Sequence, residues 1–206
     1  MTTSALLHVS QLRLRNGLQL EYAEQGRRGG VSVLMLHGIT DSWRSFTPVL
    51  LHLPHDWHVI ALSQRGHGGS AKPPTRYRTR DFAADAAEFA QALELPSLIV
   101  VGHSMGAANA MRLAIDHPAR VRGLVAAGAF ASFGDKTELV AFIRNDIAAL
   151  TDPLPRELAH AFQMDTLARA VAPWKRSANA TTVLPASESG VTGWRADRER
   201  LAAYRS

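Results

Sequence analysis

A buried strand that turns directly into a helix through two glycines is the feature that most constrains the fold of this chain. Residues 98–101 (Leu-Ile-Val-Val) form a continuous apolar run, and residues 102–106 (Gly-His-Ser-Met-Gly) follow at once. So tight a turn strains the backbone of its central residue, and side chains two positions before and after it would collide. Glycine at Gly102 and Gly106 therefore predicts that Ser104 lies at the carboxyl end of a sheet strand.

The same turn brings the Ser104 hydroxyl to the start of a helix. Unsatisfied backbone amides and the positive end of the helix dipole favour the anion that forms when a carbonyl carbon is attacked. The motif therefore indicates a nucleophilic serine. The alternative interpretation is a glycine-rich structural turn whose serine caps the helix.

Two periodicities alternate along the amino-terminal part of the chain and indicate its fold class. Residues 9–15 and 18–23 alternate between apolar and polar and flank Asn16-Gly17, a dipeptide suited to a tight hairpin turn. Nearly unbroken apolar runs, typical of strands buried on both faces, occupy residues 31–36, 59–62, 98–101 and 121–130. Helical periodicity separates them, so the sequence predicts an α/β domain: a mostly parallel sheet, flanked by helices, after an N-terminal antiparallel hairpin.

Two helices are expected between these strands. Residues 80–95 carry apolar side chains at spacings of three and four, with Thr79 as the candidate N-cap. A second helix, from Ser104 to Ile115, ends before Pro118 because proline disfavours helical geometry at the residue before it.

Changes in composition and hydrophobic periodicity divide the chain into three predicted segments. Residues 1–134 form the α/β core, and residues 135–172 form a helical cap segment with apolar residues at helical spacing. Residues 173–206 are expected to be a poorly ordered tail. Within it, residues 175–193 are rich in Ser, Thr, Asn and Gly, with one short apolar step at Val183-Leu184, and no regular structure is predicted there; residues 194–204 could form a short helix. Without a further strand, the 121–130 strand would be an open apolar edge, which favours self-association.

Composition limits the partners and cofactors. The 206 residues include no cysteine, which excludes a disulfide scaffold, a cysteine-ligated metal and a cysteine nucleophile. The net charge of +5, from 23 Lys and Arg against 18 Asp and Glu, is spread thinly, so no nucleic-acid partner is expected. No segment is long and apolar enough for a membrane span and the start lacks a signal peptide, so a cytoplasmic protein without a membrane partner or cofactor is expected.

A second strand ends in a turn that complements the serine. His37-Gly38-Ile39 follows residues 31–36, and the glycine lets the backbone bend so that the Ile39 N–H faces the serine turn. With the N–H of Met105 this makes two donors for one oxyanion. Two interpretations fit His37, a general base or a side chain that bonds to backbone and shapes the loop, and the second is favoured.

Four motifs together resemble the α/β-hydrolase family, in its branch of small esterases, lactone hydrolases, carbon–carbon bond hydrolases and cofactor-free haloperoxidases. They are His37-Gly38, residues 64–70 (Gln-Arg-Gly-His-Gly-Gly-Ser), Gly102-His103-Ser104-Met105-Gly106 and Asp116-His117-Pro118. The resemblance implies that Ser104 is the nucleophile, that Ile39 and Met105 supply the oxyanion-hole amides, and that the helices after Phe130 begin a cap over the acyl pocket. A serine at this position excludes the aspartate nucleophile of the dehalogenase and epoxide hydrolase branches.

The family's triad runs serine, acid, histidine along the chain, and the last two members are hard to find here. Only His117 and His160 follow Ser104. His117 lies at the far end of the predicted helix, about 20 Å away at 1.5 Å per residue, and cannot be the base. A triad of Ser104, Asp135 and His160 can be built, although a histidine on a cap helix is more often a surface residue.

Three histidines ahead of the serine imitate a metal site. His52, His55 and His58 cluster in the sequence, but Pro54 interrupts their spacing and they precede a strand, at the end of the sheet opposite Ser104. A solvated loop is favoured, and no metal site is expected.

Two functions fit these observations. The first is a serine hydrolase that acts on a small ester or related acyl substrate through Ser104, in a chain that is C-terminally incomplete and impaired because its acid and histidine are not found. The second is a catalytically silent, truncated member of the family that serves as a binding module or is a remnant without function.

Overall fold

The structure, a computed structural model, describes residues 7–50, 52–129, 137–142, 145 and 182–185. The chain separates into two units. The first contains the described residues up to 129 together with 182–185, and the second contains the short helix α4 (Thr137–Phe142). Asp135 and His160 lie outside the described residues, as does most of the expected helical segment.

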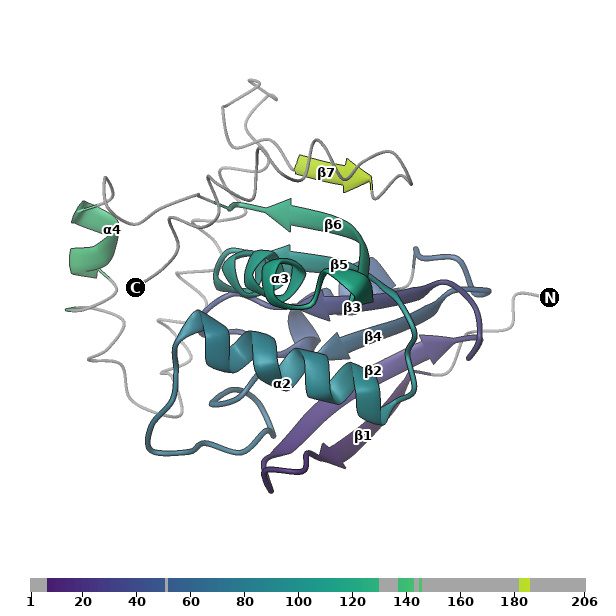
Figure 1. Ribbon diagram of the computed structural model, residues 1–206, viewed down its shortest axis with the longest axis horizontal. Helices are drawn as coiled ribbons and strands as arrows, with labels where there is room; N and C mark the ends of the chain where they lie inside the picture. The colour runs from purple at the N-terminus through teal and green to yellow at the C-terminus, as the bar shows by residue number, and fades with distance from the viewer. Residues whose placement is uncertain (1–6, 51, 130–136, 143–144, 146–181, 186–206) are drawn as a thin grey trace. The chain divides into compact units, whose positions relative to one another are not determined.

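A seven-stranded mixed sheet forms the centre of the first unit (Figure 1). Its order is β1-β2-β4-β3-β5-β6-β7. The strands are β1 (His8–Arg13), β2 (Gln19–Gly26), β3 (Ser32–Leu36), β4 (His58–Leu62), β5 (Leu98–His103), β6 (Val121–Ala127) and β7 (Thr182–Pro185). Strands β4, β3, β5 and β6 are mutually parallel, and the β1–β2 hairpin joins β4 antiparallel, which confirms the predicted fold class.

Strand β7 corrects two expectations. The prediction of no regular structure around Val183 and Leu184 is wrong, because these residues pair antiparallel with Val125 and Leu124 of β6. A strand this short is formed by pairing with its neighbour rather than by any local pattern, so periodicity does not reveal it. Strand β6 is therefore not the open edge of the sheet, and self-association through β6 loses its premise.

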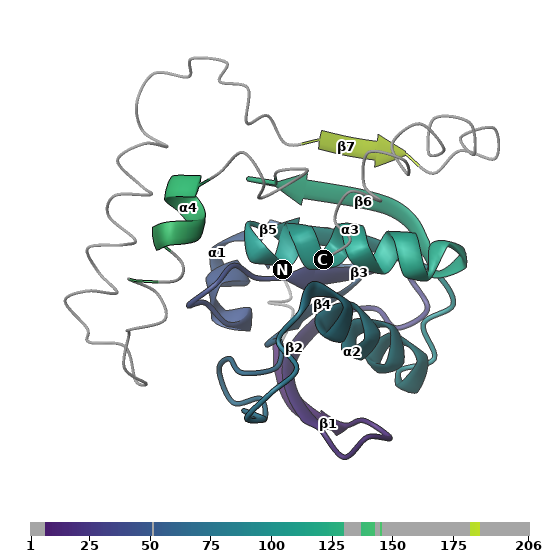
Figure 2. The same ribbon diagram turned by 60° about the vertical axis from the view of Figure 1, so that its left-hand side comes forward.

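Helices α2 (Thr79–Ala92) and α3 (Met105–Asp116) lie on the same face of the sheet, as Figures 1 and 2 show. The ring of Phe89 in α2 packs edge-on against the ring of Tyr22 in β2, with 5.1 Å between the ring centroids. Helix α3 packs on β5 and β6, and its buried alanines let it lie close to them. Among the described helices, none has the length and hydropathy to cross a bilayer.

The start of α2 differs from the prediction by one position. Thr79 is the first helical residue and Arg78 is the N-cap. The carboxylate of Asp81 accepts the backbone N–H of Arg78 at 3.0 Å. Asp81, the third residue of the helix, thus satisfies the backbone N–H of the N-cap residue from inside the first turn, and Thr79 is not the cap.

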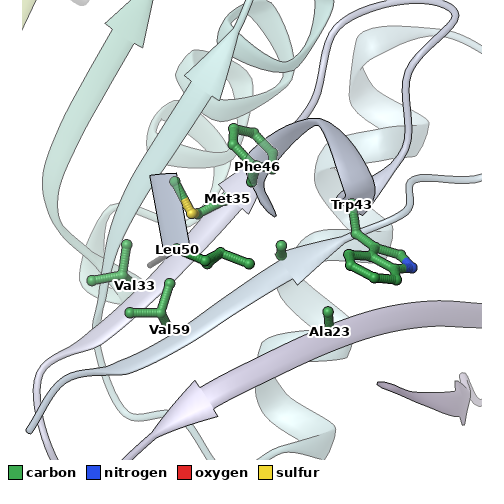
Figure 3. Close-up of a cluster of buried hydrophobic side chains, with 8 residues drawn as sticks. Ala23, Val33, Met35, Trp43, Phe46, Leu50 and Val59 are labelled. Carbon is green, nitrogen blue, oxygen red and sulfur yellow. The ribbon is translucent and has the colours of Figure 1, made fainter. Parts of the chain in front are cut away.

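The other face of the sheet packs against the segment that follows β3. Val33 and Met35 alternate with the residues that face α2 and α3 and so point to this side. They meet the 3₁₀ helix η1 (Trp43–Phe46) and helix α1 (Thr47–Leu50). The buried cluster consists of Ala23, Val33, Met35, Trp43, Phe46, Leu50, Val59 and Ala61 (Figure 3). It anchors the far end of the loop that begins at His37.

His58 corrects the interpretation of the three clustered histidines as a solvated loop. It begins β4, is buried, and its Nε2 lies 2.8 Å from the carboxylate of Glu24. Arg28 donates to the other oxygen of Glu24 at 2.6 Å. His52 and His55 are exposed, as expected. The pattern misled because the third histidine already belongs to the buried strand.

Candidate active site

Ser104 occupies the turn between β5 and α3, and its backbone is strained. Its φ of 53° and ψ of −117° lie outside the regions that residues with a side chain normally adopt. Its N–H donates to the carbonyl oxygen of Ala127 at 2.9 Å, and its own carbonyl accepts the N–H of Ala107 at 2.9 Å. Its side chain makes no capping hydrogen bond, so the interpretation of Ser104 as a helix-capping serine finds no support.

Close backbone approaches require the two flanking glycines. A Cβ at Gly102 would lie 2.3 Å from the carbonyl oxygen of Gly106, as the predicted collision across the turn demands. A Cβ at Gly106 would lie 2.1 Å from the carbonyl oxygen of Leu36 in the neighbouring strand β3. The second glycine therefore lets α3 approach β3, a contact that the sequence pattern alone did not predict.

The carboxyl ends of three parallel strands meet beside Ser104. Leu36 of β3 pairs with Leu62 of β4 on one side and with Gly102 of β5 on the other. Beyond β3, a Cβ at Gly38 would lie 3.4 Å from the Cβ of Ser104. The loop that carries Ile39 therefore runs next to the turn that precedes Met105. The backbone N–H groups of Ile39 and Met105 are the predicted oxyanion donors.

His37 bonds to backbone through both ring nitrogens, which is the role that the sequence favoured. It is fully buried, and its Nε2 accepts the N–H of Gln64 at 3.0 Å. The proton therefore sits on Nδ1, which donates to the carbonyl oxygen of Gly38 at 2.7 Å. Burial lowers the pKa of His37 to about 3, so the ring is neutral at physiological pH and has no free nitrogen for Ser104.

Asp41 is a titratable group at the turn that sequence reasoning missed. Its Oδ2 and the Nδ1 of His103 lie 3.3 and 3.1 Å from the position a Cβ would take at Gly38. Burial raises the pKa of Asp41, and the charge of nearby His103 acts in the opposite direction. The signal that could have found Asp41 was its place three residues after Gly38, in the loop predicted to face the serine.

Residues from two further motifs, Arg65 and His117, have structural roles away from Ser104. Arg65 donates to both carboxylate oxygens of Asp85 at 2.6 Å, which ties the loop after β4 to α2. His117 is the C-cap of α3, at the end of the helix away from Ser104, in agreement with its exclusion as a base. Asp135 and His160 stay predictions, since neither lies in the part of the chain that the structure describes.

Comparisons with known proteins agree with this geometry. Residues 31–189 match the family model of the alpha/beta hydrolase fold, and the chain belongs to this family. Over 109 residues it is 39% identical to 2-(acetamidomethylene)succinate hydrolase from Mesorhizobium japonicum, which covers 53% of this chain and 38% of that protein. It is 36% identical to a non-heme chloroperoxidase from Streptomyces lividans, over 52% of this chain and 39% of that protein.

Solved structures show the same likeness over more of the chain. A crystal structure of E-2-(acetamidomethylene)succinate hydrolase superposes with a TM-score of 0.68 at 27% identity, over 98% of this chain and 74% of that one. Epoxide hydrolase A from Mycobacterium thermoresistibile superposes with a TM-score of 0.56 at 26% identity, over 67% and 45% of the two chains. In sequence, the matched segment spans less than half the length of the two curated relatives named above.

Proposed function

We propose that this chain is a serine hydrolase in which Ser104 attacks the carbonyl carbon of a small ester or related acyl substrate. The observation that carries the proposal is the strained Ser104 backbone, held at the meeting point of three strand ends, with a side chain that does not cap the helix. Such strain persists only where the surrounding structure enforces it, and it clusters at functional sites.

The proposed reaction forms an acyl-enzyme on Ser104. As the serine oxygen bonds to the carbonyl carbon, the negative charge on the carbonyl oxygen would be stabilised by the N–H groups of Ile39 and Met105. One such donor contributes about 10²- to 10³-fold to the rate. The carbon–oxygen bond to the leaving alcohol then breaks, and the proton taken from Ser104 passes to that alcohol. Water attacks the acyl-enzyme, which releases the acid and returns a proton to Ser104. The sequence offers His160 and Asp135 as candidates for the base and its acid partner, and both lie outside the described residues.

The relatives support a small substrate. One is named for the hydrolysis of 2-(acetamidomethylene)succinate, which carries an acyl group of the kind that Ser104 would attack. An alternative is a catalytically silent binding module. One observation favours it. His37, the buried histidine that follows β3, has both ring nitrogens bonded to backbone and so cannot take the proton of Ser104.

Hydrolysis of a short-chain p-nitrophenyl ester tests the proposal. Ser104→Ala should lower kcat/KM by about 10³-fold or more, because it removes the nucleophile. The matched control is Ser45→Ala, an exposed serine in η1, which should leave the rate unchanged. Equal rates for the wild type and Ser104→Ala would remove the hydrolase proposal and leave the binding module.

A further inference from the structure

Three buried polar side chains connect helix α3 to the loop after β3. Asn109 and His37 are 0% exposed and Gln64 is 3% exposed. The Nδ2 of Asn109 donates to the Oε1 of Gln64 at 2.7 Å, and the Nε2 of Gln64 donates to the carbonyl oxygen of His37 at 2.8 Å. These residues come from α3, from the end of β4 and from the end of β3, so the connection spans three elements.

The direction of each hydrogen bond in this connection is fixed. The carbonyl oxygen of His37 only accepts, so Gln64 must present its NH₂ group there and its oxygen to Asn109. Asn109 must then present its own NH₂ group. At the other end, the backbone N–H of Gln64 fixes Nε2 of His37 as an acceptor, and Nδ1 donates to Gly38. No amide can flip without losing a bond.

The connection controls two consecutive peptide groups next to Ser104. Gln64 holds the carbonyl of His37, and His37 holds the carbonyl of Gly38. A trans peptide group is planar, with its N–H opposite its C=O. Because the Gly38 carbonyl and the Ile39 N–H belong to one peptide group, the bond from His37 determines where that N–H points.

The other end of the connection reaches the helix turn that carries the second donor. Asn109 lies four residues after Met105, on the same face of α3. The Oδ1 of Asn109 has no partner among the described residues. An unpaired buried acceptor is unfavourable, so a contribution to stability does not by itself explain an asparagine at this position.

We propose that Gln64 and Asn109 are positioning residues that set the Ile39 N–H relative to the Met105 N–H for an oxyanion at Ser104. The proposal rests on the proposed hydrolase function. Neither residue touches the reacting atoms. Each acts through the peptide groups of His37 and Gly38, which it holds in one orientation.

Apolar replacements of similar size separate positioning from stability. Asn109→Leu and Gln64→Met each remove the side-chain bond between the two residues. The double variant removes the unpaired Oε1 of Gln64 that Asn109→Leu leaves and the unpaired Nδ2 of Asn109 that Gln64→Met leaves. Like Gln64→Met, however, it leaves the carbonyl oxygen of His37 without its Gln64 donor. The matched control is Gln91→Met on the exposed side of α2. Asn109→Ala is added in case leucine prevents folding.

We expect each single variant to lower the thermal midpoint and to lower kcat for a p-nitrophenyl ester about tenfold at unchanged KM. Inhibition by a trifluoromethyl ketone, which forms an oxyanion on the serine, should weaken by the same factor. The double variant should have a higher thermal midpoint than Gln64→Met, because it leaves one unpaired buried group fewer, but no higher kcat, because the His37 carbonyl is still not held. A kcat that rises together with the thermal midpoint from Gln64→Met to the double variant would overturn the proposal, as would equal changes in kcat and KM.

A second measurement does not depend on activity. The amide resonances of Gly38 and Ile39 in a ¹H–¹⁵N spectrum should shift in Asn109→Leu, Asn109→Ala and Gln64→Met and stay in place in Gln91→Met. Unchanged Gly38 and Ile39 resonances would overturn the positioning role even if the enzyme is active. If the wild type is inactive but the Gly38 and Ile39 resonances shift in the variants as expected, the hydrolase function is overturned and the positioning of the loop by Gln64 and Asn109 still holds.

Discussion

The imidazole of His37 donates to one backbone group and accepts from another, and folding therefore requires it to be neutral. Protonation of Nε2 would place a positive N–H against the N–H of Gln64, in a site without solvent. Burial disfavours the charged form of the ring and lowers the pKa of His37 to about 3. The residue that holds the Gly38 carbonyl is thus linked to the stability of the whole protein in acid.

Stability should fall between pH 6.5 and pH 3 because of this residue. In that range the unfolded chain binds a proton at His37, with a pKa of about 6.5, that the folded chain does not bind. Above pH 6.5 the contribution of the neutral His37 to the free energy of unfolding is fully present. Below pH 6.5 the free energy of unfolding decreases by up to about 1.4 kcal/mol per pH unit because of this residue. Urea unfolding of the wild type and His37→Asn from pH 7 to pH 4.5 measures this slope.

The variant should lose stability at pH 7 and show a shallower decline in acid than the wild type. His55→Asn, which changes an exposed histidine, is the control and should keep the wild-type slope. Identical slopes for the wild type and His37→Asn would contradict the assignment of a neutral, buried imidazole.

The sequence allowed single residues to be placed where the backbone restricts their type. Ser104 could be located from its two flanking glycines, and the structural role of His37 from its place before Gly38. Gln64, Asn109 and Asp41 could not be assigned their contacts. Those contacts join side chains from different elements, and their geometry depends on how α3 packs on the sheet, which no local pattern describes.

At the scale of elements, the approach of α3 to β3 depends on Gly106. Gly106→Ala should destabilise the fold by about 2 kcal/mol or more, because its Cβ would lie 2.1 Å from a backbone oxygen of Leu36, which cannot move without shifting the strand. Gly123→Ala is a matched control in β6, since its Cβ would meet only the side chain of Ile99, at 3.5 Å. Urea unfolding of both variants compares them directly, and equal losses of stability would show that the close approach is not a constraint.

The elements themselves could be predicted where they are long or regular. The parallel strands were recognised from their apolar runs, and α2 and α3 from their periodicity and from Pro118. Strand β7 was missed because it forms only by pairing with β6, a segment distant in the sequence. The N-cap of α2 is Arg78, one residue before the predicted Thr79, because the Asp81 carboxylate accepts the Arg78 N–H and so allows the helix to begin one residue earlier.

At the scale of the whole molecule, the sheet topology creates the candidate site. Parallel strands β3, β4 and β5 end at the same edge, so the loops after them converge whatever their separation in the sequence. The parallel sheet could be expected from the alternation of strands and helices. Its strand order, with β4 between β2 and β3, depends on crossovers and could not be assigned from the sequence.

Covalent labelling measures whether Ser104 is a reactive nucleophile. The full chain is treated with a fluorophosphonate, and the modified peptide is identified by mass spectrometry in the wild type, Ser104→Ala and Ser45→Ala. We expect one adduct, on Ser104, in the wild type and in Ser45→Ala, and none in Ser104→Ala. An unmodified wild type, or an adduct formed at the same rate in Ser104→Ala, would contradict the assignment of Ser104 as the nucleophile.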